Sequence, residues 1–143
     1  MTSESTELAT TRRPSTAVLA GGGIVLSALI IFAGNYDVQP GENGGTSAAI
    51  ITGVGCAIVA AVLFGLVVPR VRNADRAALV LGVLTVLSIA IFWSGLTPIL
   101  AATTVAVADK SQDQPRRTTV MRWLAIAAAA LVTIWTLAVS HLF

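Results

Sequence analysis

Two acidic side chains in one glycine-rich segment are the first candidates for chemistry in this sequence. Asp37 and Glu42 stand five residues apart, and two nearby carboxylates can act as a general acid and a general base. The segment around them, residues 35–46, contains Pro40 and several Gly and Asn residues, which is typical of a loop. We therefore interpret both carboxylates as solvated loop charges rather than as a catalytic pair.

The single cysteine and the single histidine offer little more. Cys56 lies among apolar neighbours, where a thiol behaves as a small inert hydrophobic side chain. His141 stands two residues from the C-terminus, where we expect an interfacial polar group. One Cys and one His cannot form a Cys/His metal cluster, so we predict no catalytic residue, no metal site and no cofactor.

The composition indicates the environment in which the elements must fold. Of the 143 residues, 55% are hydrophobic and 11% are charged, and the mean hydropathy is +0.83. An ordinary soluble domain carries about 25% charged residues, and a disordered chain needs low hydrophobicity and high charge. The sequence therefore excludes both classes and predicts an all-α integral membrane protein.

The chain divides into a tail and a predicted bundle. Residues 1–16 are polar and lack apolar periodicity, which predicts a disordered cytoplasmic tail, and residues 17–143 are predicted to form the transmembrane bundle. The first span, 17–34, has 18 uncharged residues and would reach roughly 27 Å as a helix. A signal peptide cleaved near Ala33 is the alternative, but the stretch is longer than a usual signal sequence, which favours a retained anchor.

The apolar stretch from Ala77 to Ala108 is too long for one helix. Its 32 residues would span about 48 Å and need a tilt beyond the observed limit of about 40°. Gly95 predicts a break, with Thr97 as the cap of the next helix and Pro98 in its first turn. That next helix is short, so it must extend toward residue 112, thin the bilayer or lean on its neighbours. Pro69 ends the second span, and the predicted spans are about 17–34, 47–68, 77–93, 96–112 and 120–143.

The positions of the basic residues favour five spans. With the N-terminus in the cytoplasm, five spans place all Lys and Arg residues on the cytoplasmic side, as the positive-inside rule favours. Four spans, or a re-entrant loop, would split them almost evenly. We therefore predict a polytopic five-helix bundle in the bacterial plasma membrane, with four spans as the alternative. The basic residues are Arg12, Arg13, Arg70, Arg72, Arg76, Lys110, Arg116, Arg117 and Arg122.

These basic residues have two expected uses. They fix the topology, and they can attract anionic lipid headgroups at about 1 kcal/mol per charge near the surface. A nucleic-acid partner is not expected, because no aromatic residues are interleaved with the basic ones as a folded nucleic-acid module requires.

Small residues predict where helices pack closely. On the second span they recur at every fourth position, as in small-xxx-small motifs, and we expect this stripe to contact another helix, mostly of the same chain. Gly21 to Gly23, and the pair Ala78 and Gly82, are further candidates for close contacts. The stripe consists of Ala49, Gly53, Ala57, Ala61 and Gly65.

One aromatic residue is a candidate contact with protein. Trp135 falls near the middle of the last span, where its indole N–H needs a partner on a neighbouring helix. Thr133, Thr136 and Ser140 on the same span are expected to bond their own carbonyls four residues earlier.

The segment from Leu79 to Ala108, LVLGVLTVLSIAIFWSGLTPILAATTVAVA, resembles small multi-span proteins of high-GC actinobacteria. Its LVLGVL run, followed by a turn and a second short apolar helix, is similar to the two-helix unit of the DUF4190-type membrane proteins. The resemblance implies a plasma-membrane location, favours two spans in this segment and carries over no catalytic residue.

Two functions follow as hypotheses. The first is a non-catalytic accessory or scaffold subunit that packs into a larger membrane assembly, with respiratory and envelope-synthesis complexes as the settings considered. The second is a small homo-oligomeric transporter or channel for neutral or lipophilic solutes, because five short helices alone leave little room for a pore. An enzyme is not expected, since the loops offer no extramembrane domain to hold a substrate.

Overall fold

The computed structural model describes residues 14–35, 45–111 and 115–142, and every regular element in these ranges is helical. Helix α1 is Thr16–Asn35. Helix α2, Thr46–Val62, continues through a π-helical turn, η1, at Leu63–Val67 into α3, Val68–Arg70. The remaining elements are α4 (Ala74–Leu87), the 3-10 segment η2 (Ser88–Ser94), α5 (Leu96–Ala108) and α6 (Arg116–Leu142). The predicted all-α fold is confirmed.

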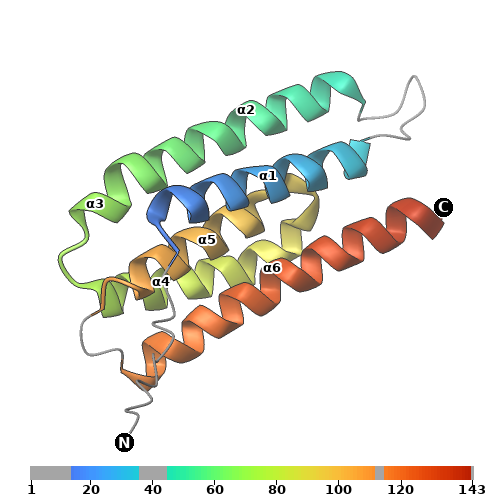
Figure 1. The fold of residues 1–143 in the computed structure, drawn as a ribbon. Helices are drawn as coiled ribbons and strands as arrows, with labels where there is room; N and C mark the ends of the chain where they lie inside the picture. Colours follow the sequence, from blue (N-terminus) through green and yellow to red (C-terminus); the bar gives the residue numbers. More distant parts are fainter. Residues whose placement is uncertain (1–13, 36–44, 112–114, 143) are drawn as a thin grey trace, which may run out of the picture.

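Successive helices run in opposite directions (Figure 1). The start of α1 and the links from α3 to α4 and from α5 to α6 therefore lie at one end, which we call the basic end. The basic end carries Arg70, Arg72, Arg76, Lys110, Arg116, Arg117 and Arg122. The turn at Gly95 and the last turn of α6 lie at the opposite end.

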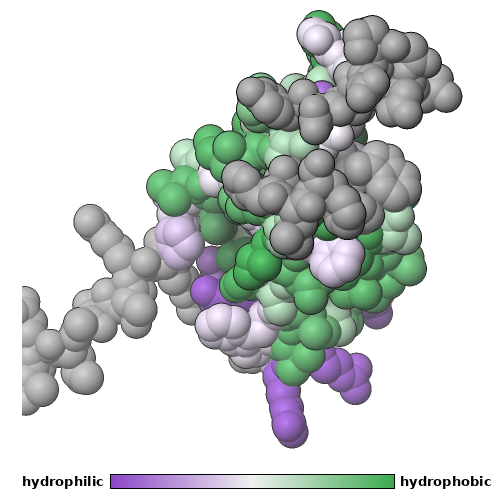
Figure 2. All heavy atoms as spheres, turned by 90° about the vertical axis from the view of Figure 1, so that its right-hand side faces the viewer, coloured by the Kyte–Doolittle hydropathy of each residue, from purple (hydrophilic) through white to green (hydrophobic). Residues whose placement is uncertain are grey.

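Four helices in the described ranges are long and apolar enough to cross a membrane, namely Thr16–Asn35, Thr46–Arg70, Ala74–Ile91 and Arg116–Val139. Their outward side chains are apolar, including Val18, Phe32 and Ile51, all more than 60% exposed. Viewed from the end opposite the basic end, apolar side chains make up much of the described surface (Figure 2). Such a surface suits lipid and not water.

The short helix α5 lies inside the bundle, packed against α1, α4 and α6 (Figure 1). Ten of its 13 residues are buried, including three threonines. Because protein covers most of its surface, α5 does not need the full length of the hydrocarbon core to be shielded. Of the three expected solutions for a short helix, leaning on neighbours is the one that this fold shows.

Three helices begin or end at residues other than the limits of the predicted spans. The fourth span does not extend to residue 112, because after Ala108 the N–H groups of Lys110 and Ser111 bond to carbonyls three residues back, in a tight turn that ends α5. The fifth helix begins at Arg116, one turn before its apolar part starts at residue 120. The second helix passes through Pro69 to Arg70 instead of ending at residue 68.

The π-helical turn explains why Pro69 does not stop that helix. The Val68 N–H bonds to the carbonyl of Leu63, five residues back, so the helix widens just before the proline. A proline in a helix has no N–H and its ring crowds the carbonyl four residues earlier. The wider turn relieves that crowding.

Gly95 forms the predicted break between η2 and α5. Its φ is +69°, and a Cβ there would lie 2.7 Å from Ser27 Oγ and 3.0 Å from Ile31 Cγ1. Only glycine satisfies both the left-handed backbone and the close approach of α1. The helix cap is Gly95 itself, so the expectation that Thr97 is the cap is wrong.

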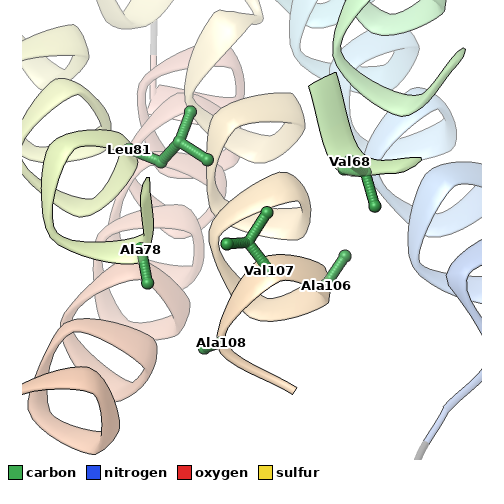
Figure 3. Close-up of a cluster of buried hydrophobic side chains, with 6 residues drawn as sticks. All are labelled: Val68, Ala78, Leu81, Ala106, Val107 and Ala108. Carbon is green, nitrogen blue, oxygen red and sulfur yellow. The ribbon is translucent and has the colours of Figure 1, made fainter. Parts of the chain in front are cut away.

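Small side chains close the bundle near the basic end. A buried cluster joins α3, α4 and α5, with Ala78 and Leu81 of α4 and Val68 of α3 on either side of α5 (Figure 3). Next to it, Gly82 lets α6 approach α4, because a Cβ at Gly82 would lie 3.0 Å from Met121 Sδ. The full cluster is Val68, Ala78, Leu81, Ala106, Val107 and Ala108.

Candidate functional site

An apolar groove lies between α1, α5 and α6. Its volume is about 400 Å³. Thr133 carries the only polar side chain in its lining, and that hydroxyl donates a hydrogen bond to the Ala129 carbonyl of its own helix at 2.7 Å. The other lining residues are Val18, Leu19, Gly22, Gly23, Leu26, Pro98, Ala101, Ala102, Val105, Ile126, Ala129, Ala130 and Ile134.

Small residues on all three helices create this groove. Gly23 packs tightly on α5, where a Cβ would lie 3.0 Å from Ala102 Cβ and 3.3 Å from the Pro98 carbonyl oxygen. Gly22 beside it has open space, with no atom within 4 Å of a Cβ position. On α6, Ala129 and Ala130 are likewise too short to reach α1. The groove is the volume that these small side chains leave unfilled.

At its basic end the groove meets charged residues. Arg122 stands one turn before Ile126 on α6, and its Nη1 lies 2.9 Å from Asp109 Oδ1. The Arg122 side chain is 30% exposed, and its Nε has no hydrogen-bond partner. A hollow of about 10 Å³, close to the size of one water molecule, lies beside Arg122, Ala108 and Thr118.

Hydrogen bonds hold the basic end together. Asp75 Oδ1, in the first turn of α4, accepts from Ser111 Oγ at 2.7 Å and from Thr118 Oγ1 at 2.9 Å. Asn73 caps α4 by accepting from the Arg76 N–H, and Lys110 Nζ donates to the Val68 carbonyl. Ser111, just after α5, and Thr118, in the first turn of α6, are thereby both tied to the start of α4, which positions Arg122 one turn further along α6.

Buried hydroxyl groups join α4 and η2 to α5. Ser88 Oγ lies 2.9 Å from Thr97 Oγ1, and Thr97 Oγ1 lies 3.2 Å from the Ser88 carbonyl oxygen. Thr85 Oγ1 and Thr104 Oγ1 are 3.2 Å apart. Sequence reasoning missed these residues. The available signal was their spacing in a segment without charged residues, three residues between Thr85 and Ser88 and seven between Thr97 and Thr104.

The small-residue stripe of α2 lies only partly in a contact within the chain. Ala49 and Gly53 are half-buried, whereas Ala57, Ala61 and Gly65 are exposed, and a Cβ at Gly53 or Gly65 would have no neighbour within 4 Å. The buried residues of α2 are Cys56 and Ala60 instead. The expectation that the stripe mostly contacts helices of its own chain is therefore corrected.

The geometry of a helix explains this result. Four residues turn an α-helix by about 400°, so a stripe at every fourth position winds by about 40° per step. It starts at the seam with α1 and turns onto the outer surface within three steps. A role in packing against another chain stays a prediction.

Trp135 is 58% exposed, so its own chain does not bury it. A contact with another protein stays a prediction for this residue. The neighbouring hydroxyls behave as expected, since Thr133 donates to Ala129 O and Thr136 donates to Val132 O at 2.9 Å.

Several candidate residues lie outside the described part of the chain. These are Asp37, Glu42, Arg12 and Arg13, together with the side chains of Ser140 and His141. Cys56 is buried, and its thiol donates to the Ser94 carbonyl at 2.9 Å. Among the described residues no group of three His, Cys, Asp or Glu side chains could hold a metal ion.

Comparisons with protein-family models, with the curated proteins and with the solved structures find no match to this chain. The resemblance to DUF4190-type proteins therefore stays a hypothesis.

Proposed function

We propose that this membrane protein is a non-catalytic accessory or scaffold subunit that packs into a larger assembly of the plasma membrane. The observation that carries the proposal is the outward face of α2. Within the most apolar 18-residue stretch of the helix Thr46–Arg70, only 11% is buried inside the protein, a smaller share than in the other three long helices. The exposed half of the small-residue stripe lies on this face.

The stripe favours a transmembrane helix as the occupant of this face. Two helices that meet along small residues spaced by four cross at about −40°, which follows the winding of the stripe on α2. The side chains that flank the stripe are large and apolar, among them Ile50, Val54 and Ile58, each at least 55% exposed. The contact would therefore lie within the bilayer.

The position of α6 supports a scaffold rather than a single docking contact. Helices α2 and α6 lie at opposite sides of the bundle (Figure 1). Each exposes a feature suited to protein contact, the stripe on α2 and Trp135 on α6. A subunit with two such faces can join two neighbours in one membrane.

The test compares two leucine variants of α2. Ala61→Leu places a large side chain on the stripe, and Gly55→Leu places one on an exposed position about 120° away around the same helix, where a Cβ meets nothing within 4 Å. Tagged protein is purified from native membranes in mild detergent, and co-purified proteins are quantified by mass spectrometry. We expect a stoichiometric unrelated membrane protein whose recovery falls about tenfold or more with Ala61→Leu and is unchanged with Gly55→Leu.

Other results would contradict the proposal. Equal recovery of the partner with both variants would remove the stripe as the docking face. Recovery of the chain only as multiples of its own mass of 14.7 kDa would instead support the homo-oligomeric transporter and make solute-flux assays the next experiment.

A further inference from the structure

We propose that the α1–α5–α6 groove binds one acyl chain of an anionic phospholipid, with the headgroup held at the basic end beside Arg116 and Arg122. This inference is independent of the proposed function, because the groove contains no residue of α2.

The lining of the groove requires an apolar occupant. Its one hydroxyl, on Thr133, already donates to a backbone carbonyl, so the groove presents hydrocarbon almost throughout. A polar solute would lose its hydration there without compensating hydrogen bonds.

The groove runs along the helix axes. On α6 the lining extends from Ile126 to Ile134 and on α1 from Val18 to Leu26, which is about 12 Å of helix in each case. The groove is therefore long enough to hold part of one extended acyl chain that enters from the basic end.

The charge distribution selects the headgroup. Counted at 100° per residue, Arg116 lies five turns before Ile134 on the same line of α6, and Arg122 lies one turn before Ile126. Both cations thus continue the groove-lining face toward the basic end. Asp109 pairs with Arg122 and offsets part of its charge, whereas Arg116 is exposed. The net local charge is positive, which attracts a phosphate.

Trp123 marks the depth at which this headgroup would sit. It is 64% exposed, and along α6 it comes after Arg116 and Arg122 and before the first lining residue, Ile126. Indole rings favour the boundary between headgroups and hydrocarbon. The boundary therefore falls at the start of the groove, so a lipid with its phosphate at Arg116 would begin its acyl chain where the lining begins.

Adjacent glycines provide a matched pair of variants. Gly22→Leu fills the groove without a clash, because no atom lies within 4 Å of its Cβ position. Gly21→Leu adds the same side chain to the same turn of α1 outside the lining, where space is equally open. Arg116→Gln and Arg117→Gln form a second pair. Arg117 is the control, because it lies on the side of α6 that carries Trp135, which does not line the groove.

The experiment titrates delipidated full-length protein in detergent with phosphatidylglycerol or with phosphatidylcholine of the same acyl chains, and native mass spectrometry counts the bound lipid. We expect one saturable phosphatidylglycerol that binds more tightly than phosphatidylcholine. Gly22→Leu should lower the affinity for both lipids about tenfold. Arg116→Gln should lower the affinity for phosphatidylglycerol about fivefold and leave the affinity for phosphatidylcholine unchanged. The Gly21 and Arg117 variants should bind as the parent does.

Several outcomes would overturn the inference. Unchanged binding with Gly22→Leu would place the lipid elsewhere, and equal affinity for both lipids would remove the headgroup contact. Binding of glycerol phosphate as tight as that of the lipid would assign the site to free phosphate. Loss of a co-purified protein in Gly22→Leu, with lipid binding intact, would assign the groove to a partner helix.

Discussion

At the scale of single residues, neighbouring glycines of one sequence do different things. Gly22 and Gly23 are adjacent and chemically identical, yet one leaves a groove open and the other fixes the contact between α1 and α5. Gly95 adds a third role, since it combines a left-handed backbone with the closest approach of any described glycine to a neighbouring helix. The residue type alone therefore does not define the role, whereas the space around Cβ does.

We predict that Gly95→Ala destabilises the protein by about 2–5 kcal/mol, because a left-handed alanine costs about 1–2 kcal/mol and overpacking costs a further 1–3 kcal/mol. Unfolding in mixed micelles measures the difference. Adding Ser27→Ala should recover part of the steric cost, since it removes the hydroxyl 2.7 Å from the new Cβ, whereas the contact with Ile31 Cγ1 at 3.0 Å and the backbone cost remain. Gly34→Ala, in open space on α1, is the control and should lose no stability. A Gly95→Ala variant as stable as the parent would show that the turn can rearrange.

At the scale of elements, the hydroxyl contacts between α4, η2 and α5 differ in strength although their distances are similar. Thr85 and Thr104 each lie close to a carbonyl four residues back, at 2.7 and 2.8 Å, so each single hydroxyl proton is already used. Their mutual contact at 3.2 Å then has no proton to share. Ser88 Oγ likewise lies 2.7 Å from the Thr85 carbonyl oxygen, which competes with Thr97 for its proton. Thr97 Oγ1 can still donate to the Ser88 carbonyl, so this pair keeps one hydrogen bond between the elements, and its acceptor is backbone.

A double-mutant cycle tests this difference. We expect Thr97→Val to destabilise the protein by about 0.5–1.5 kcal/mol both in the parent and in Ser88→Ala, because the acceptor is the Ser88 backbone carbonyl. For Thr85→Val with Thr104→Val we expect a coupling free energy near zero. Unfolding of the four single and two double variants in the same micelles provides the values. A clearly favourable coupling between Thr85 and Thr104 would mean that the threonines release their backbone carbonyls and bond to each other.

The sequence predicted the elements of this fold better than their contacts. Charge-free stretches, Gly95 and Pro98 were sufficient to place five helices, because an apolar helix of a given length has few alternatives in a bilayer. The faces of these helices were not predictable, because lipid and protein interior are equally apolar and hydrophobic periodicity does not distinguish them. The stripe on α2 shows this limit, since its residues were found from spacing but three of the five are exposed. The groove was missed for the same reason, since it depends on which helices become neighbours.

At the scale of the whole molecule, the buried position of α5 bears on the number of spans. If α5 turned back without crossing, the link between α3 and α4 and the link between α5 and α6 could not lie at the same end of the bundle. They do lie together, and Asp75 of α4 bonds to Ser111 and Thr118 across them. The fold therefore places Arg72 and Arg117 at the same end of the bundle, and the positive-inside rule then predicts that this end faces the cytoplasm.

Cysteine labelling in intact cells tests this arrangement. In a Cys56→Ala background, an impermeant maleimide should label Gly41→Cys from outside, whereas Arg72→Cys and Arg117→Cys should react only after permeabilisation. Arg72 and Arg117 are both exposed, so a lack of labelling reflects the side of the membrane, whereas a cysteine at the buried Ser111 would stay unreactive on either side. Labelling of Arg117→Cys but not of Arg72→Cys in intact cells would require four spans. The basic residues of α6 would then lie on the outer side of the membrane, where they could not attract the anionic lipids of the cytoplasmic leaflet.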